Sequence, residues 1–577
     1  MNSKFSKLSF LIIIIVSSLI ISSCGEQNAS ADLVLYNGKI VTLNDSDYVA
    51  EAIAVKNDTI WKIGTSENIK QLIGKNTEKI NLKGKFVIPG FNDAHLHFEG
   101  VGQAKMKLEL QKATNWNEII LMVLEASEKA KPGEWILGRG WHQEKWDPNP
   151  DPNVEGYPIH EQLSRATPYN PVMLTHASGH AVFVNTKAME LAGIDDSTKS
   201  PEGGKIVRDA DGKATGVFEE NAETLITAKL NEYLNSRTPE AIKSDKLKAL
   251  KLGYEEFHKY GITSVTDAGS TFDDIDFYKS LADSSQLQVR LNTMLYIEDA
   301  KELAEKISGY KIYGYGNNFL SVHSIKKYID GALGSRGALF MADYSDLPGH
   351  RGQLVTPISE MEKAADIAIE NGFQLCTHAI GDKGNREVLR IYKNAFDKHP
   401  DKTDLRWRVE HAQHLSVRDI PKFGEYGVIA SMQGIHCTSD APYVINRLGS
   451  YRAEKGAYVW RDLIDSGAII CNGTDAPIES VNTINNFYAL VTRRTKDDRE
   501  FYPQQKMTRL EALRAYTING AYASFEEDIK GTLEAGKLAD IVVLSEDLLE
   551  CADWRIPNTE IIYTILGGKI VYKTEEK

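Results

Sequence analysis

The chain has 577 residues, of which 42% are hydrophobic and 25% are charged, which is the balance of a soluble globular protein with about two to four domains. The 67 basic residues against 80 acidic ones give a net charge of −13, which excludes a protein built to hold nucleic-acid phosphates. Five cysteines in this length exclude a small disulfide scaffold, and the composition excludes a multi-span transporter.

The N-terminus has the pattern of a bacterial lipoprotein signal. Two lysines precede a short apolar run that ends at Ile21, and small residues then lead to Cys24. The run is short for a spanning helix, which needs about 20 apolar residues. We therefore expect a signal peptide over 1–23, lipidation of Cys24 and a tether over 24–31, in a periplasmic or outer-membrane protein held at the membrane by its N-terminal lipid. An uncleaved anchor or an ordinary signal peptide is the alternative.

Short strand-like runs stand at both ends of the mature chain. Apolar and β-branched residues at 33–41 are matched by similar runs at 540–544 and 561–571. We expect residues 32–84 and 525–577 to form one composite β-sandwich. Two unrelated β patches are the alternative.

Between these ends, short β-rich runs alternate with longer helical patterns, which indicates βα units around a parallel sheet. Eight candidate strands lie at 85–88 (leading into Phe91), 263–266, 289–294, 324–329, 373–377, 405–409, 428–432 and 468–471. Eight such units predict an α/β fold, a (β/α)₈ TIM barrel over 85–99 and 246–524. The first gap is too long for one helix, so we expect a subdomain inserted after strand one over 100–245.

Metal-binding residue types follow four of these strands. His95 and His97 follow the first strand and point the same way, so that they can close on one ion. His378, His411 and Asp475 follow the fifth, sixth and eighth strands. Each alone could be structural, but barrels carry their active sites at this end of the strands. Neutral imidazoles with a carboxylate therefore predict a divalent-metal site, with Zn²⁺ as the expected ion.

The fourth strand carries a lysine that shares one face with an aromatic residue and a carboxylate, Lys326 with Tyr328 and Asp330. A lysine that faces a barrel interior is costly unless it is neutralised or paired. Reaction with CO₂ to a carbamate would turn Lys326 into an anionic oxygen ligand. The alternatives are an ion pair with Asp330, or Lys327 as the inward residue.

The order HxH, Lys, His, His and Asp on strands one, four, five, six and eight resembles the amidohydrolase superfamily. The motifs at 89–97, 326–336 and 408–413 are similar to amidohydrolase family 3, in its YtcJ-like and N-substituted formamide deformylase-like branch. The likeness runs over about 33–571. It implies a metal-dependent barrel that hydrolyses non-peptide carbon–nitrogen bonds, in an amide, an N-formyl group or a cyclic amide.

The resemblance also implies roles for individual residues. His95 and His97 would hold one metal with Asp475, and His378 and His411 would hold a second ion or complete a mononuclear site. Lys326 matches a lysine that is carbamylated in some members. The metal would lower the pKa of water towards about 7 to supply hydroxide, and Asp475 would act first as general base and then as general acid.

Other residues are candidates for contacts with the substrate. His180 and His436 could polarise the carbonyl and stabilise the oxyanion, with a structural loop role as an equal alternative. Trp141 and Arg336 could line the pocket, and for these two a structural role is the stronger alternative.

We expect a small-molecule substrate and no nucleic-acid partner, and the resemblance is compatible with a homodimer. One rival function is deamination of a heterocycle, or ester cleavage, at the same site. Another is a non-catalytic ligand-binding lipoprotein, although the full set of ligand-type residues favours an enzyme.

Overall fold

The computed structural model describes residues 30–143, 146–177, 181–201 and 204–575. The predicted signal peptide, Cys24 and His180 lie outside these residues. The chain forms two compact units, which are described one at a time. The inserted unit is Phe98–Glu255, where the sequence predicted an insertion over 100–245, and the barrel unit is the rest of the chain.

The barrel unit contains eight parallel strands, each paired with the next in chain order. They are β8 (Phe91–Leu96), β17 (Ile262–Ser270), β18 (Arg290–Leu295), β20 (Leu320–Tyr328), β21 (Gln374–Ala379), β22 (Arg408–His411), β23 (Ile429–Met432) and β24 (Ile470–Asn472). Ala94 on β8 and Cys471 on β24 share one buried cluster, so the first and last strands lie close together and nearly close the barrel. The predicted (β/α)₈ class is confirmed.

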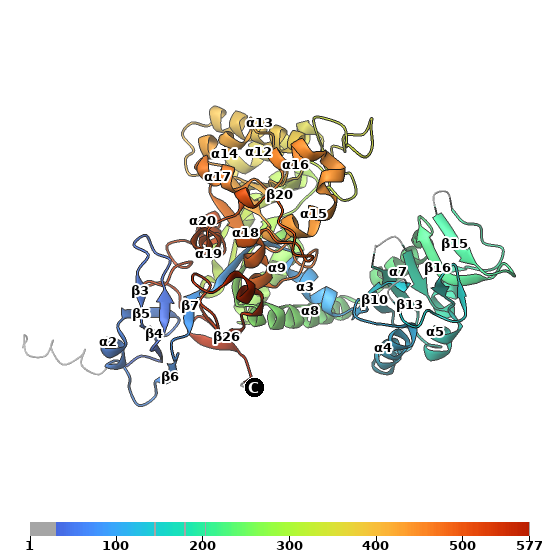
Figure 1. The fold of residues 1–577 in the computed structure, drawn as a ribbon, viewed down its shortest axis with the longest axis horizontal. Helices are drawn as coiled ribbons and strands as arrows, with labels where there is room; N and C mark the ends of the chain where they lie inside the picture. Colours follow the sequence, from blue (N-terminus) through green and yellow to red (C-terminus); the bar gives the residue numbers. More distant parts are fainter. Residues whose placement is uncertain (1–29, 144–145, 178–180, 202–203, 576–577) are drawn as a thin grey trace, which may run out of the picture. The chain divides into compact units, whose positions relative to one another are not determined.

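Helices follow the strands of the barrel, as βα units require. They are α9 (Phe272–Asp283), α10 (Ala300–Lys306), α12 (Ile358–Asn371), α13 (Asp382–Lys398), α14 (Ile420–Tyr426), α15 (Gly434–Leu448), α16 (Ser450–Gly456), α17 (Trp460–Asp465) and α18 (Thr483–Thr492). The helix before β17, α8 (Pro239–Lys259), has residues 239–255 in the inserted unit. Figure 1 shows α12 to α17 gathered in one part of this unit. Two helices, α19 (Arg509–Ala515) and α20 (Ile518–Ala523), come after the last unit.

The first predicted strand is displaced in the structure. Residues 86–89 form β7 (Phe86–Pro89), which pairs with strands of the terminal sheet, and the barrel strand begins only at Phe91. Pro89 and Gly90 separate the two, and the Gly90 backbone N–H donates to the Asp540 carbonyl at 2.9 Å. One predicted strand is therefore two strands in different sheets, and His95 lies within β8 rather than after it.

Strands from both ends of the chain build two facing sheets. One sheet has the order β5 (Thr59–Gly64), β4 (Ala52–Lys56), β1 (Leu33–Tyr36) and β6 (Glu78–Asn81). The other has the order β27 (Lys569–Lys573), β26 (Ile561–Leu566), β25 (Ile541–Leu544), β7, β2 (Lys39–Val41) and β3 (Val49–Ala50), and β7 and β26 are both visible in Figure 1. Leu35, Val87 and Val543 lie in one buried cluster, so the two ends share a core.

The inserted unit has a mixed sheet of its own, with the order β15 (Gly204–Arg208), β16 (Ala214–Glu220), β14 (Ala181–Val184), β13 (Val172–His176), β10 (Ile136–Trp141) and β9 (Leu108–Glu109). Its helices are α3 (Phe98–Lys105), α4 (Trp116–Lys129), α5 (Glu161–Ala166), α6 (Thr186–Ala192) and α7 (Glu223–Asn235). Buried side chains on both faces of this sheet form two separate apolar clusters.

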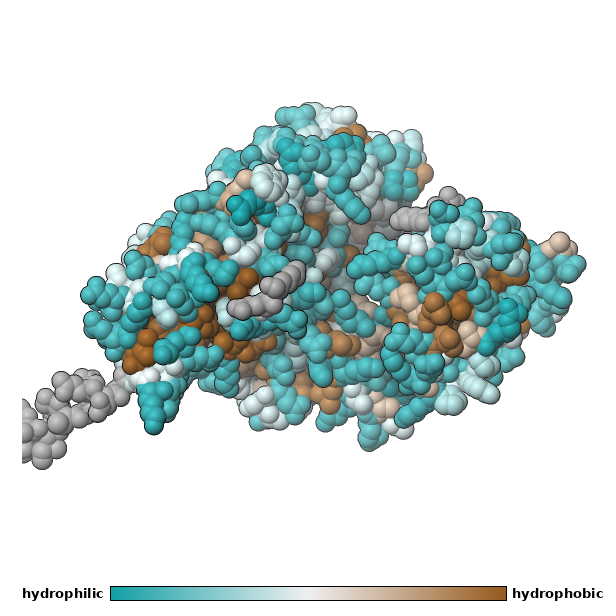
Figure 2. All heavy atoms as spheres, turned by 60° about the horizontal axis from the view of Figure 1, so that its bottom comes forward, coloured by the Kyte–Doolittle hydropathy of each residue, from teal (hydrophilic) through white to brown (hydrophobic). Residues whose placement is uncertain are grey.

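The face of the molecule in Figure 2 is mostly hydrophilic, in keeping with the high content of charged residues. Within the described ranges, no helix combines the length and the apolar composition that crossing a membrane requires. Four cysteines lie in these ranges and all are free thiols, with Cys376, Cys437 and Cys471 buried.

Candidate metal centre

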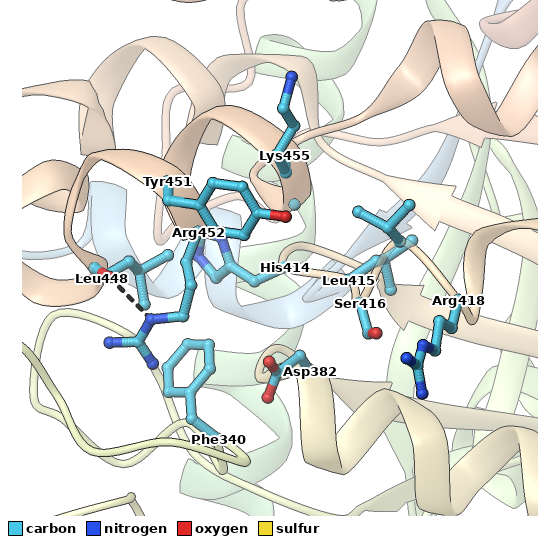
Figure 3. A pocket seen from close by; sticks show the side chains of 12 residues that line it. Phe340, Asp382, His414, Leu415, Ser416, Arg418, Leu448, Tyr451, Arg452 and Lys455 are labelled. Carbon is cyan, nitrogen blue, oxygen red and sulfur yellow. Dashed lines mark hydrogen bonds between the residues drawn. The ribbon is translucent and has the colours of Figure 1, made fainter.

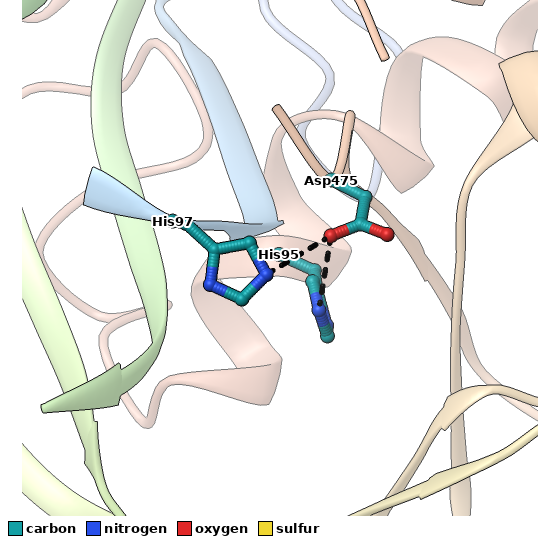
Figure 4. A group of neighbouring side chains, drawn as sticks. All are labelled: His95, His97 and Asp475. Carbon is teal, nitrogen blue, oxygen red and sulfur yellow. Dashed lines mark ion pairs between the residues drawn. The ribbon is translucent and has the colours of Figure 1, made fainter. Parts of the chain in front are cut away.

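His95, His97 and Asp475 converge at the carboxyl end of the barrel strands (Figure 4). The Nε2 atom of His97 lies 3.4 Å from Asp475 Oδ1, and that of His95 lies 3.7 Å from the same oxygen. One ligand atom from each of the three residues lies within 4.8 Å of the others. Three side chains from opposite ends of the sequence can therefore hold one metal ion.

The backbone of Asp475 is fixed against the first strand. Its N–H donates to the His95 carbonyl at 2.7 Å, and the neighbouring Thr474 hydroxyl donates to Asp93 at 2.6 Å. Asp475 itself has a left-handed φ of 56°, which turns its side chain just after β24 ends. The loop after the eighth strand thus carries the carboxylate to the two histidines of the first.

His378, His411 and Lys326 surround the same centre from three further strands. The ring centroid of His411 lies 4.9 Å from that of His95 and 4.5 Å from that of His378. The Lys326 Nζ lies 4.7 Å above the Tyr328 ring, and the charges of Glu410 and Asp475 act on it. All the residues predicted to bind the metal are thus collected at one end of one barrel.

The structure decides which lysine of β20 faces inward. Lys326 is fully buried, whereas Lys327 donates from its Nζ to the Ile297 carbonyl at 2.6 Å. Asp330, the predicted alternative partner of Lys326, instead accepts backbone N–H bonds from Leu339 and Gly381, each at 2.8 Å. Lys326 therefore faces the centre, and Asp330 holds the backbone of the neighbouring loops.

The protonation of the centre suits a cation. Burial, assisted by the Lys326 charge, lowers the pKa of His95 to about 4 and that of His378 to about 3, so both rings are neutral at pH 7. Burial alone would raise the pKa of Asp475, but the adjacent His436 and His97 rings outweigh it and hold that pKa well below its ordinary value. Neutral imidazoles and an ionised carboxylate are the states that bind a divalent metal.

Two buried polar atoms of the candidate ligands lack a hydrogen-bond partner within the described part of the chain, the Lys326 Nζ and the His378 Nε2. Buried polar groups are nearly always satisfied in folded proteins. A divalent ion would satisfy the His378 nitrogen by accepting its lone pair, so the histidines fit the metal that the strand-end pattern predicts.

Two residues that the sequence interpretation did not single out lie directly behind His95. Glu410 is completely buried and its Oε2 forms a very short hydrogen bond with His95 Nδ1. Arg408, also completely buried, donates to both oxygens of Glu410, at 2.7 and 2.9 Å. The two charges stand two residues apart in a buried strand, which is the signal that could have identified them.

His436 and Arg336 lie in the barrel unit, but only His436 contacts the centre. The Nε2 of His436, on α15, lies 3.4 Å from Asp475 Oδ2. Arg336 lies in the long segment between β20 and α12 and forms an ion pair with Asp346, at 2.9 Å. Asp346 also pairs with Arg447, so the Arg336 side chain is engaged by a surface carboxylate.

Trp141 belongs to the core of the inserted unit. It is completely buried, and its indole N–H donates to the Leu174 carbonyl at 2.8 Å. Its ring packs near Phe183 and Trp146 in one apolar cluster. This is the position of a structural residue, which was the stronger alternative for Trp141. His180 is outside the described residues.

A separate cavity of about 240 Å³ lies beyond the loops that follow β21 and β22 (Figure 3). Asp382, at the start of α13, and His414, just after β22, line it together with Arg452 of α16. None of the candidate metal ligands lines this cavity. It is therefore distinct from the metal centre.

The similarity of this chain to known proteins agrees with the geometry. A model of the amidohydrolase family matches residues 78–572. Protein LONG AFTER FAR-RED 3 of Arabidopsis thaliana is 32% identical over 94% of this chain and 92% of its own length. The putative amidohydrolase YtcJ of Bacillus subtilis is 31% identical over 94% and 99%, and the N-substituted formamide deformylase of Arthrobacter pascens is 25% identical over 94% and 98%.

Solved structures share the fold over a similar length. An uncharacterised metal-dependent hydrolase from Pyrococcus furiosus has a TM-score of 0.71 at 25% identity, with 90% of this chain and 100% of that chain covered. The corresponding protein from Pyrococcus horikoshii has a TM-score of 0.72 at 26% identity, with 90% and 99% covered.

Proposed function

Because this chain belongs to the amidohydrolase family, we propose that it hydrolyses a non-peptide carbon–nitrogen bond, in an amide, an N-formyl group or a cyclic amide, with the help of a divalent metal ion. The observation that carries the proposal is the convergence of His95, His97 and Asp475 within 4.8 Å of one another, with His378 and His411 beside them.

The comparisons support the reaction class and leave the substrate to experiment. One relative that matches nearly the whole chain is named an N-substituted formamide deformylase, and two solved neighbours are described as metal-dependent hydrolases. Neither a deaminase, nor an esterase, nor a non-catalytic binding protein is favoured by matches of this extent. A small amide is therefore the first class of substrate to test.

The proposed metal ligands all come from this chain. His95, His97 and Asp475 would hold the ion, with His378, His411 and Lys326 available for completing the site or for a second ion. When bound, a divalent metal supplies Lewis acidity that activates water and polarises a carbonyl. We propose Zn²⁺, because imidazole and carboxylate ligands with an open position suit it.

Asp475 and His436 are placed to move protons. The carboxylate of Asp475 is ionised, and its Oδ2 faces His436 Nε2 at 3.4 Å. Burial would lower the pKa of His436, but the charge and hydrogen bond of Asp475 outweigh it and raise that pKa above its ordinary value. Asp475 would accept the proton of the attacking water and pass it to the leaving nitrogen, while His436 holds Oδ2 in place.

Metal analysis combined with a substrate panel tests this function. We expect purified protein to contain one or two divalent ions per chain and to hydrolyse at least one member of a panel of N-formyl, N-acyl and cyclic amides. Parallel assays with aminated heterocycles and with esters measure the rival reactions. Normal turnover of a discovered amide by both His95→Ala and Asp475→Ala would contradict the proposed site.

We also propose that Lys326 is carbamylated when the metal is bound. Its burial and the resulting lowering of its pKa favour the neutral amine that reacts with CO₂, and its Nζ has no hydrogen-bond partner among the residues that the structure describes. The test is ¹³C NMR of protein loaded with metal in ¹³C-bicarbonate. A carbamate resonance that is lost in Lys326→Met supports the proposal, and its absence from the wild-type spectrum contradicts it.

The proposed location is the bacterial cell envelope, with Cys24 as the lipid attachment site. The support is the sequence pattern alone, in which a short apolar run and small residues precede a single cysteine. Partition of the expressed full chain into detergent phase, lost in Cys24→Ser, is the expected result. The same preparation, sized by light scattering, tests the proposed homodimer.

A further inference from the structure

We propose that Glu410 and Arg408 are positioning residues that fix which ring nitrogen of His95 faces the metal centre. Both lie on β22, immediately before the candidate ligand His411. The inference rests on the proposed metal site and adds to it two side chains that act through His95.

The contact between Glu410 and His95 defines the tautomer of the ring. The Oε2 of Glu410 is hydrogen-bonded to His95 Nδ1, and both side chains are buried from solvent. A carboxylate only accepts hydrogen bonds, so His95 Nδ1 must carry the proton. The lone pair of the neutral ring is then on Nε2, the nitrogen that lies 3.7 Å from Asp475 Oδ1. Glu410 therefore presents the ligating nitrogen to the centre.

Arg408 makes the buried carboxylate possible and holds it in one orientation. An isolated buried anion would be very costly. The Arg408 Nε and Nη2 donate to the two oxygens of Glu410 in a fork at 2.7 and 2.9 Å. This forked contact is the arrangement in which a guanidinium binds an ionised carboxylate, so Arg408 stabilises the charged form of Glu410 beside His95.

Arg408 also connects strands that are not neighbours in the barrel. Its Nη2 donates to the Ala94 carbonyl on β8 and to the Ser431 hydroxyl on β23, both at 2.7 Å. Strand β22 is the sixth of the barrel and β8 the first, so this guanidinium crosses the interior to the residue next to His95. One side chain thus fixes both the backbone of His95 and the carboxylate that orients its ring.

Three of the four candidate histidine ligands, His95, His378 and His411, differ in this respect. His411 Nδ1 is bonded to the neutral Gln433 side chain at 2.7 Å, and the His378 Nε2 is without a hydrogen bond among the residues described. His95 alone of these three has an anionic partner with its own cation behind it. Carboxylate partners raise the basicity of ligating histidines, and their loss typically weakens metal binding by about 10–100-fold.

The test compares metal affinity in variants of this pair with a matched variant elsewhere. Affinity for Zn²⁺ is measured by competition with a chromogenic chelator, and the visible spectrum of the Co²⁺-loaded protein reports ligand geometry. Glu410→Gln removes the charge, and its amide N–H₂ must face either Arg408 or His95 as a mismatched donor. Glu410→Asp restores the charge. The control, Asp540→Asn, breaks the buried Arg290–Asp540 ion pair, which has no histidine among its hydrogen-bond partners in the described ranges.

We expect Glu410→Gln to bind Zn²⁺ about 10–100-fold more weakly with an altered Co²⁺ spectrum, Glu410→Asp to recover part of the affinity, and Asp540→Asn to keep the wild-type affinity. Wild-type affinity in folded Glu410→Gln overturns the inference, as does an equal loss in Asp540→Asn, since general destabilisation would then explain the effect. If Glu410→Gln does not fold, Ser431→Ala is used instead, because it removes a hydrogen-bond acceptor of Arg408. An unchanged Zn²⁺ affinity in Ser431→Ala would then contradict the inference.

Comparison of two variants distinguishes a wrong positioning role for Glu410 from a wrong metal site. His95→Ala removes a proposed ligand and should abolish high-affinity binding. If His95→Ala binds Zn²⁺ normally, the proposed function fails. If His95→Ala loses the metal while Glu410→Gln keeps it, only the positioning role is wrong.

Discussion

The two ends of the barrel treat buried charge differently. At the amino ends of the strands, Arg290 forms a two-pronged ion pair with Asp540, at 2.6 and 2.9 Å. In the same region, Lys530 pairs with Glu526 and donates to the Ser264 hydroxyl at 2.9 Å. At the carboxyl ends, Lys326 is completely buried with no hydrogen-bond partner in the described ranges.

This difference separates charges that serve stability from charges that serve a ligand. Removing one partner of a buried ion pair leaves an uncompensated charge, so the folded protein depends on both partners of each pair at the amino ends. The buried Lys326 amine has no hydrogen bond or ion pair of this kind among the described residues. It is explained when a ligand completes its surroundings.

The largest expected effect is on catalysis at the carboxyl ends. Asp475→Asn keeps the shape of the side chain but removes the proton acceptor and a metal ligand, so turnover should fall by about 10²–10⁴-fold. The folded protein should remain intact, which circular dichroism and thermal unfolding can verify. A turnover within a factor of two of the wild type would remove Asp475 from the mechanism.

The matched change at the amino ends should act on stability instead. Asp540→Asn leaves Arg290 buried beside a neutral amide, and we expect the free energy of unfolding to fall by about 3–5 kcal/mol. Turnover per folded molecule should equal that of the wild type. Urea unfolding and an active-site titration give the two numbers, and a loss of turnover without a loss of stability would erase the distinction between the ends.

Metal removal should destabilise the barrel through the carboxyl ends alone. An ion present at 100 times its Kd stabilises the folded state by about 2.7 kcal/mol. We therefore expect chelation to lower the midpoint of urea unfolding in the wild type, and to leave that of His95→Ala unchanged. An equal shift in both proteins would place the metal somewhere else.

Burial of Lys326 should lower the free energy of unfolding of the metal-free protein. Lys326→Met replaces a buried amine by an apolar side chain of similar length, and we expect the free energy of unfolding to rise by about 1–2 kcal/mol. Activity should be lost at the same time. Destabilisation by this substitution, measured after chelation, would show that Lys326 has a structural partner.

The smallest expected effect is at the N-terminus of helix α19, which belongs to neither group of buried charges. The Thr508 hydroxyl accepts the Glu511 N–H and the Glu511 carboxylate accepts the Thr508 N–H, which together form a capping box at the start of α19. Thr508→Ala should cost about 1 kcal/mol of unfolding free energy. Zn²⁺ affinity should not change, and a measurable change would show that the metal assay responds to stability in general.

Much of the centre was predictable because a parallel barrel brings the carboxyl ends of all its strands to one rim. His95, His97 and Asp475 could be assigned to one place from their positions after apolar strand-like runs, and the structure brings them together. The first barrel strand was misplaced, because the apolar residues at 86–88 look like a barrel strand and those after Gly90 are interrupted by Asn92, Asp93 and His95. Only the pairing of 86–89 with the terminal strands shows that the barrel strand begins at Phe91.

The positioning roles of Arg408 and Glu410 were harder to predict from the sequence. Strand alternation puts Arg408 and Glu410 on one face of β22 and would turn His411 to the other. In the structure, His411 has a left-handed φ of 73°, so that Glu410 and His411 both face the interior of the barrel although they are consecutive. Trp141 shows the opposite difficulty, since an aromatic residue of a core and one of a pocket look alike in sequence.

That backbone geometry has a consequence for how such a protein can be engineered. His411 and Asp475 both have positive φ values, of 73° and 56°, where a side chain costs about 1–3 kcal/mol. Glycine would relax the main chain at either position and delete a ligand in the same step. A library selected only for heat resistance would therefore enrich well-folded but inert barrels, and a screen for hardier variants has to assay chemistry in every round.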